Sequence, residues 1–285
     1  MISKKRDFYL FQIFGFRVSA DWSWLVVFVL MSLSLATGYF PSNLVGESGV
    51  TYWLMGIISS ALLFLSVVLH EVGHSYVAYQ NGIRILGIRL FIFGGVAEMA
   101  SEPRSPEVEL KVAVAGPLVS AVLAVFFYLL SHSPVAVLGA PFLMVTSFLA
   151  RVNLAMVLFN LLPGFPLDGG RILRALLWRI KGSYYRSTLI ATGAGKAVAF
   201  GFMGLGILSF LMGGFLNGLW LIFVGMFLHQ AAQAAQTQLE LQRFGFLNDW
   251  LFQDYPDWDL PIRNHWSFRD PDRRYWEVMF EDVMR

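Results

Sequence analysis

Three ionisable side chains lie close together in the motif HEVGH: His70, Glu71 and His74. A helix of about 3.6 residues per turn places two histidines four residues apart on one face, where both imidazoles reach the same metal ion. Zinc binds imidazole nitrogen readily, and catalytic zinc sites have three protein ligands and one open position for water. Glu71 is rotated about 100° from His70. It is therefore placed to accept a proton from water rather than to bind the metal.

The third ligand must come from elsewhere in the chain. The protein has no cysteine, which excludes thiolate ligands, and the other histidines are poorly placed. His132 is expected at the opposite membrane face, His229 at the end of the last span, and His265 in the tail. Asp168 of PGFPLDGGR is the better candidate, because its prolines and glycines break a helix inside an apolar region. The alternative is that Asp168 only caps the helix that follows.

Asn160, just before this broken segment, has two interpretations. Its amide could hold the irregular backbone together, or it could donate a hydrogen bond to a developing oxyanion. Asn153, two turns earlier, is expected to form a hydrogen bond between helices.

Composition identifies the class of protein that holds these residues. The chain of 285 residues is 56% hydrophobic and 14% charged, and its mean hydropathy is +0.60. Soluble domains have about 25% charged residues, so this chain lacks the polar residues to cover a water-soluble domain. A net charge of +2 without a basic stripe argues against nucleic-acid binding. We therefore predict a polytopic membrane protein in contact with the lipid bilayer.

The predicted fold is all-α with about six transmembrane helices and a short membrane-associated β-hairpin or sheet. The expected spans are residues 22–40, 51–80, 109–130, a fourth from about 141 that is interrupted at the Pro/Gly-rich segment, 186–212 and 215–233. The motif AGPLVSA in the third span is expected to provide small residues for helix packing, without a chemical role. The segments FGFRVSADW and IRILGIRLFIFGGVAEM are expected to form strands.

Basic residues predict the orientation in the membrane. They precede the first span and follow the second and fourth, whereas the alternating connections contain neither lysine nor arginine. Both termini and the site are therefore expected on the cytoplasmic side of a cell inner or plasma membrane. No removable signal peptide is expected. The predicted regions are 1–21, an N-terminal cytoplasmic segment with an edge strand; 22–236, the intramembrane domain; and 237–285, an acidic and aromatic cytoplasmic tail.

The motifs HEVGH, FGGVAE, EPRSPEVELKVAVAGPLVSAVLA and NLAMVLFNLLPGFPLDGGR occur in this order. With them, residues 14–233 closely resemble the site-2 protease family of intramembrane zinc metalloproteases. The resemblance implies one Zn²⁺ per chain bound by His70, His74 and Asp168, with Glu71 as general base. It implies hydrolysis of peptide bonds within transmembrane helices of substrates such as membrane-tethered regulators. A cytoplasmic pair of CBS domains, frequent in such six-span proteins, is not expected in the tail.

The resemblance also favours a role for the strand FIFGGVAEM in binding an unwound substrate helix. Strand edges pair with extended peptides, and glycine allows close approach of the backbone. Phe93, Gly94, Gly95 and Val96 are the expected substrate-binding residues, and the alternative is a plain membrane-associated hairpin. Two other functions stay open, a zinc transporter and a catalytically inactive protein that binds membrane proteins. Assembly into a homo-oligomer is also left open.

Overall fold

A computed structural model describes residues 8–91, 94–132 and 139–251. Two compact units are present. The first runs through Pro163 and includes Leu167–Ile172, and the second contains Gly164–Pro166 and the residues from Leu173 onward. All the predicted site residues that the structure describes belong to the first unit.

Six helical segments are long and apolar enough to cross a membrane, which confirms the predicted multi-pass class. The first combines α1 (Trp22–Ser34), the π-helix η1 (Leu35–Tyr39) and α2 (Phe40–Asn43). The others are α3 (Gly49–Gln80), α4 (Pro106–Ser131), α5 (Gly139–Asn160), α7 (Tyr184–Leu211) and α8 (Phe215–Leu251). In α8 the spanning part ends at Leu241. A shorter helix, α6, covers Asp168–Lys181.

Side-chain caps define where several of these helices begin. Asp21 accepts a hydrogen bond from the backbone of Ser23 at the start of α1, and Ser48 accepts one from Thr51 at the start of α3. Ser105 caps α4, whose first residue is Pro106. Such caps satisfy amide groups that the helix leaves without a partner, and proline has no amide hydrogen to satisfy there.

Four strands form one mixed sheet in the order β1-β2-β3-β4. They are β1 (Phe8–Ile13), β2 (Phe16–Ala20), β3 (Ile85–Phe91) and β4 (Gly94–Met99). The β1/β2 and β3/β4 pairs are antiparallel, whereas β2 and β3 are parallel. The prediction anticipated the β3/β4 hairpin and β2 but omitted β1, so the strand near the N-terminus is in fact a hairpin.

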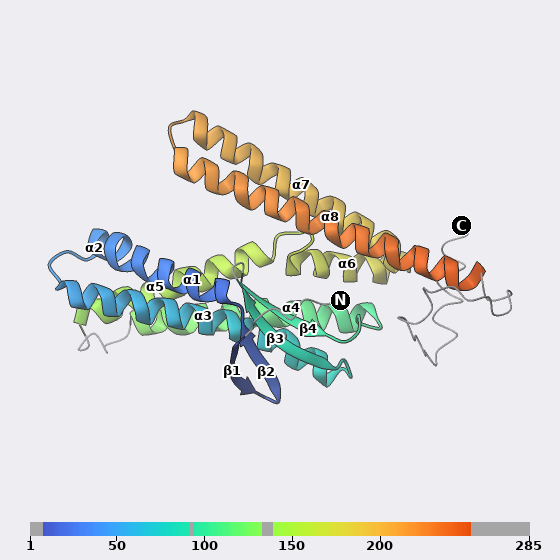
Figure 1. The fold of residues 1–285 in the computed structure, drawn as a ribbon, viewed down its shortest axis with the longest axis horizontal. Coiled ribbons are helices and arrows are strands. Elements are labelled where there is room, and N and C mark those ends of the chain that lie inside the picture. Colours follow the sequence, from blue (N-terminus) through green and yellow to red (C-terminus); the bar gives the residue numbers. More distant parts are fainter. Residues whose placement is uncertain (1–7, 92–93, 133–138, 252–285) are drawn as a thin grey trace. The chain divides into compact units, whose positions relative to one another are not determined.

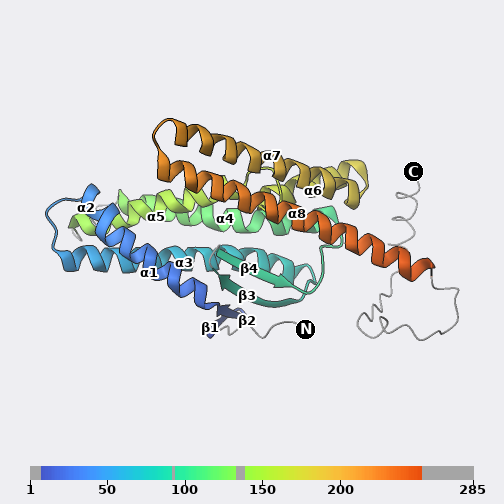
Figure 2. The same cartoon turned by 45° about the horizontal axis from the view of Figure 1, so that its top comes forward.

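The sheet lies against the C-terminal half of α3, as both views show (Figures 1 and 2). Val18 and Leu90 of the sheet are almost fully buried against Val68 and Val72 of α3. Because Val68 and Val72 flank His70 on the same helix, this hydrophobic cluster fixes the sheet beside the HEVGH motif. In the first unit, α4 packs against both α3 and α5.

The fourth span is interrupted, as predicted. α5 ends at Asn160 and α6 begins at Asp168, with turns and bends between them. Gly169 is essential to this path, because a Cβ there would lie 2.3 Å from the carbonyl oxygen of Leu162 and 2.4 Å from that of Leu161. The chain can therefore return against the end of α5 only where the residue lacks a side chain.

In the second unit, α7 and α8 run side by side (Figure 1). α8 continues well past the predicted end of the sixth span at residue 233, and through the predicted domain boundary at residue 236. His229 therefore lies within this helix, with its ring 5.3 Å from that of Phe200, rather than at the helix end. Most of the predicted tail, residues 252–285, lies outside the described residues.

Candidate metal centre and active site

Two imidazoles of α3 and the carboxylate at the start of α6 converge on one point. The Nε2 atoms of His70 and His74 are 3.2 Å apart. Nε2 of His70 lies 3.2 Å from Oδ2 of Asp168, and Nε2 of His74 lies 3.2 Å from Oδ1 of the same carboxylate. All three side chains are almost completely buried. They form a group that could hold a metal ion, assembled from the residues that the sequence had selected.

Helix α4 contacts both imidazoles at their Nδ1 atoms. Nδ1 of His74 is 2.7 Å from the carbonyl oxygen of Val112, and Nδ1 of His70 is 2.9 Å from the hydroxyl of Ser120. A carbonyl oxygen only accepts hydrogen bonds, so Nδ1 of His74 carries the hydrogen and Nε2 of the neutral ring presents a lone pair. The motif AGPLVSA packs closely through Gly116, as expected, and its Ser120 in addition lies within hydrogen-bonding distance of the His70 ring.

The donor atoms fit a zinc ion in both chemistry and spacing. With Nδ1 bonded to Val112, Nε2 of His74 faces an oxygen of the Asp168 carboxylate at 3.2 Å, and a metal ion between them would be bound by both atoms. Two ligands about 2.1 Å from zinc at a tetrahedral angle are about 3.4 Å apart. The three distances of 3.2 Å are therefore close to those that tetrahedral zinc requires. Three ligands leave the fourth position for water or substrate.

Glu71 follows His70 in α3, and its side chain contacts strand β4. Its Oε2 accepts a hydrogen bond of 3.2 Å from the backbone N–H of Ala97. A Cβ at Gly95 would lie 2.6 Å from Cγ of Glu71, so the strand can approach this closely only because Gly95 has no side chain. The sequence predicted roles for Glu71 and Gly95 separately, and the structure brings the two residues into contact.

The other predicted site residues lie on β4 and α5 or outside the described residues. Gly94 begins β4, Val96 lies exposed on it, and Phe93 lies outside the described residues. Asn160 is the last residue of α5 and half-buried, and its catalytic role stays a prediction. Asn153 is fully buried, and its Nδ2 donates to Ser66 of α3 at 3.3 Å, as expected for a bond between helices.

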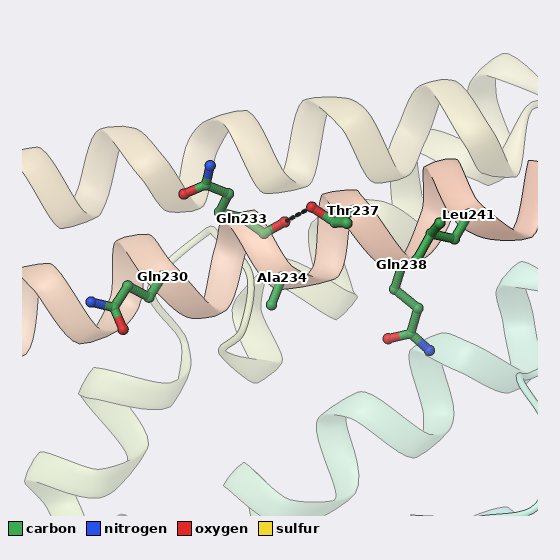
Figure 3. Close-up of a pocket in the computed structure, with 6 residues that line it drawn as sticks. All are labelled: Gln230, Gln233, Ala234, Thr237, Gln238 and Leu241. Atoms are coloured by element: carbon green, nitrogen blue, oxygen red, sulfur yellow. Dashed lines mark hydrogen bonds between the residues drawn. The ribbon is translucent and has the colours of Figure 1, made fainter.

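A separate hollow of about 450 Å³ lies along α8 and is unrelated to this group (Figure 3). Its lining residues are Gln230, Gln233, Ala234, Thr237, Gln238 and Leu241. They all belong to one helix, and the one dashed bond joins Thr237 to the backbone of Gln233 one turn earlier. None of them is charged, and none is a histidine or a carboxylate.

Comparison with known proteins identifies the family. The profile of Peptidase family M50 matches residues 58–142 and 131–203, a region that holds all three ligand candidates. The structure of the site-2 protease from Methanocaldococcus jannaschii superposes with a TM-score of 0.54 at 35% sequence identity. The match covers 81% of this chain and 95% of that structure.

The chain belongs to peptidase family M50, the site-2 protease family.

Curated relatives of this M50 protein include three named as zinc metalloproteases. Rip3 of Mycobacterium tuberculosis is 39% identical over 233 residues, which are 81% of this chain and 59% of Rip3. The protein sll0528 of Synechocystis is 39% identical over 244 residues, 82% of this chain and 62% of that protein. MJ0392 of M. jannaschii is 41% identical over 182 residues, 64% of this chain and 50% of that protein. The M50 chain thus spans about half to three fifths of the length of these relatives.

Sequence reasoning selected the three ligand candidates of this M50 chain, but it missed the residues of α4 that contact the two imidazoles. Gly116 is one of those missed: a Cβ there would lie 2.1 Å from Nε2 of His74 and 2.7 Å from Nε2 of His70. Ser120 and the carbonyl of Val112 are the others. A signal was available, because Val112, Gly116 and Ser120 recur at intervals of four, a spacing that places them on one helix face.

Proposed function

We propose that this chain is a zinc-dependent intramembrane endopeptidase that hydrolyses peptide bonds within or near transmembrane helices of other membrane proteins. One observation carries the proposal. The Nε2 atoms of His70 and His74 and the Asp168 carboxylate converge at distances suited to tetrahedral zinc, with Glu71 beside them. Polar groups of this kind are costly in membrane-spanning segments and usually functional.

Each side chain has a defined task in this proposal. His70, His74 and Asp168 would hold one zinc ion. Bound there, zinc would supply a Lewis acid for the scissile carbonyl and would lower the pKa of water toward neutral pH. Glu71 accepts that proton on a carboxylate oxygen and later delivers it to the amine of the leaving peptide. The amide of Asn160, if it reaches the scissile carbonyl, would stabilise the oxyanion.

Strand β4 is the proposed binding site for the unwound substrate. It is an edge strand of the sheet in the described part of the chain, so one side of it lacks a neighbouring strand. Ala97 directs its N–H to Glu71 rather than to β3, and strand alternation therefore turns Gly95 to the same outer side. A substrate segment paired with the backbone of Gly95 and the carbonyl of Ala97 would replace backbone hydrogen bonds lost on unwinding, and it would lie next to Glu71.

The distribution of basic residues supports a location with both termini and the metal site toward the cytoplasm. A multi-pass protein of an inner or plasma membrane with such a site fits substrates that release a cytoplasmic portion, such as membrane-tethered regulators. A single-pass protein of this kind is the proposed partner, together with the surrounding bilayer. Oligomerisation is not required by the proposal.

The two alternatives have less support. A zinc transporter needs binding sites in series along its path, and the described residues contain one group of histidine and acidic side chains with metal-binding geometry. A catalytically inactive binding protein has no need of a general base, yet Glu71 is intact and adjacent to the ligands. Both observations favour the peptidase.

The test is cleavage of a helical single-span substrate by the purified chain in detergent or lipid. Fragments should form, disappear with a zinc chelator and return when zinc is restored. Glu71→Gln should keep bound zinc but lower the cleavage rate by about 10²- to 10⁴-fold. Glu47→Gln is the matched control, since Glu47 precedes α3 and lies at its other end. Cleavage by Glu71→Gln at the parental rate, or cleavage insensitive to the chelator, would contradict the proposal.

A further inference from the structure

Three residues of α4 form a stripe that contacts the rings of His70 and His74. Val112, Gly116 and Ser120 are four residues apart and therefore share one face of the helix. Gly116 allows the two imidazoles to lie against the helix, because a Cβ there would overlap both rings. Above and below it, Val112 and Ser120 bind the Nδ1 atoms of His74 and His70 respectively. Two residues of the stripe, Val112 and Ser120, thus each contact one histidine, and Gly116 lies against both rings.

The hydroxyl of Ser120 has an imidazole of the candidate metal group as its partner. Ser32 donates to the carbonyl four residues earlier in its own helix, at 2.8 Å, which is the usual behaviour of serine inside a helix. Ser66 makes the same bond within its helix at 2.9 Å and also accepts one from the amide of Asn153. Ser120 is fully buried, and its oxygen lies 2.9 Å from an imidazole nitrogen of another helix. Its position is therefore suited to orienting a ring.

We propose that Ser120 is a positioning residue for zinc binding, whose hydroxyl accepts the Nδ1–H of His70 and turns Nε2 toward the ion. This inference rests on the zinc site of the proposed function. The hydrogen bond fixes both the tautomer and the rotation of the His70 ring, and it increases the basicity of Nε2. His74 needs no such side chain, because a backbone carbonyl does the same for it.

This difference between the two histidines makes the inference testable. A side-chain substitution cannot remove the carbonyl of Val112, whereas Ser120→Ala removes the hydrogen bond to His70 by deleting one oxygen atom. Alanine adds no volume and has the highest helix propensity, so α4 should keep its structure. Ser32→Ala is the matched control, since Ser32 is a buried serine of α1 whose hydroxyl bonds only to its own helix in the described contacts.

The experiment measures the zinc affinity of the purified chain directly, by competition with a chelator of known affinity. Loss of a residue that orients a metal ligand typically weakens binding by about 10- to 100-fold. We expect a shift of this size for Ser120→Ala and a shift below twofold for Ser32→Ala. The visible spectrum of the Co²⁺-loaded protein should also change for Ser120→Ala alone, because the ring of His70 would be reoriented in the ligand field.

Parental zinc affinity together with an unchanged Co²⁺ spectrum in Ser120→Ala would overturn the inference. This failure is distinguishable from failure of the proposed function. A parent chain that binds one zinc but does not cleave membrane helices would contradict the peptidase and leave the role of Ser120 intact. A parent chain that binds no zinc would contradict both.

Discussion

Gly116 is the residue of α4 that lies against the two imidazoles, and the substitution Gly116→Ala tests this packing most directly. The new methyl carbon would lie 2.1 Å from Nε2 of His74, 2.5 Å from its Cε1 and 2.7 Å from Nε2 of His70. Ordinary contact begins at 3.4 Å, so the His74 ring would have to retreat by about 1.3 Å. The ring cannot swing away freely, because its Nδ1 is bonded to Val112 on the same helix as the new methyl group.

This displacement is large on the scale of metal coordination. Zinc–nitrogen distances in proteins lie within about 0.2 Å of their typical values, so a shift several times larger removes His74 as a ligand. We expect Gly116→Ala to bind zinc at least about 100-fold more weakly. Cleavage should fall by at least the same factor, since misplacement of a catalytic group by about 1 Å alone costs about 10²-fold.

Zinc content after dialysis, chelator competition and cleavage of a helical substrate measure the effect. Gly201→Ala is the matched control, because Gly201 lies inside the spanning helix α7 and its added Cβ would meet nothing within 4 Å. Both substitutions favour helix formation, by about 0.5–1 kcal/mol, so loss of zinc cannot be ascribed to loss of α4. If Gly116→Ala binds one zinc with parental affinity and cleaves normally, the deduced packing of α4 against the histidines is wrong.

Three other predictions follow from the close contacts and the metal site. Gly95→Ala should displace Glu71, because Cγ of Glu71 would lie 2.6 Å from the new Cβ. Cleavage should fall at least about tenfold, while zinc content stays at one per chain. Loss of zinc in this variant would contradict the assigned geometry. Gly195→Ala places a Cβ 2.1 Å from the carbonyl oxygen of Phe165 and should destabilise the second unit by about 1–3 kcal/mol in thermal unfolding. Gly193→Ala is the control and should leave the stability unchanged, because its Cβ has open space around it. Zinc at about 100 times its dissociation constant should stabilise the folded chain by about 2.7 kcal/mol. The midpoint temperature of unfolding should therefore be higher with zinc than with a chelator. Identical midpoints would argue against a zinc site in the folded state.

The sequence alone predicted the membrane class, the six spans, the break in the fourth span and the three ligand candidates. These features depend on local signals. Apolar runs of the required length identify membrane spans, and a spacing of four places His70 and His74 on one face. Two prolines and three glycines around Asp168 make an unbroken helix implausible there. In each case the property is present in a short segment, so no knowledge of distant residues is needed.

Only the tertiary structure decided how these parts meet. The sequence could not show that Ser120 contacts His70, since 50 residues and a strand hairpin separate them. Nor could it show that the N–H of Ala97 is bonded to Glu71. Such contacts depend on which faces of α3, α4 and the sheet are packed together. That choice is made by buried surfaces such as the Val68 and Val72 cluster, which involve many residues that are far apart in the chain. Spacing in the sequence therefore determined which groups can bind the metal, and packing between helices determined how they are oriented.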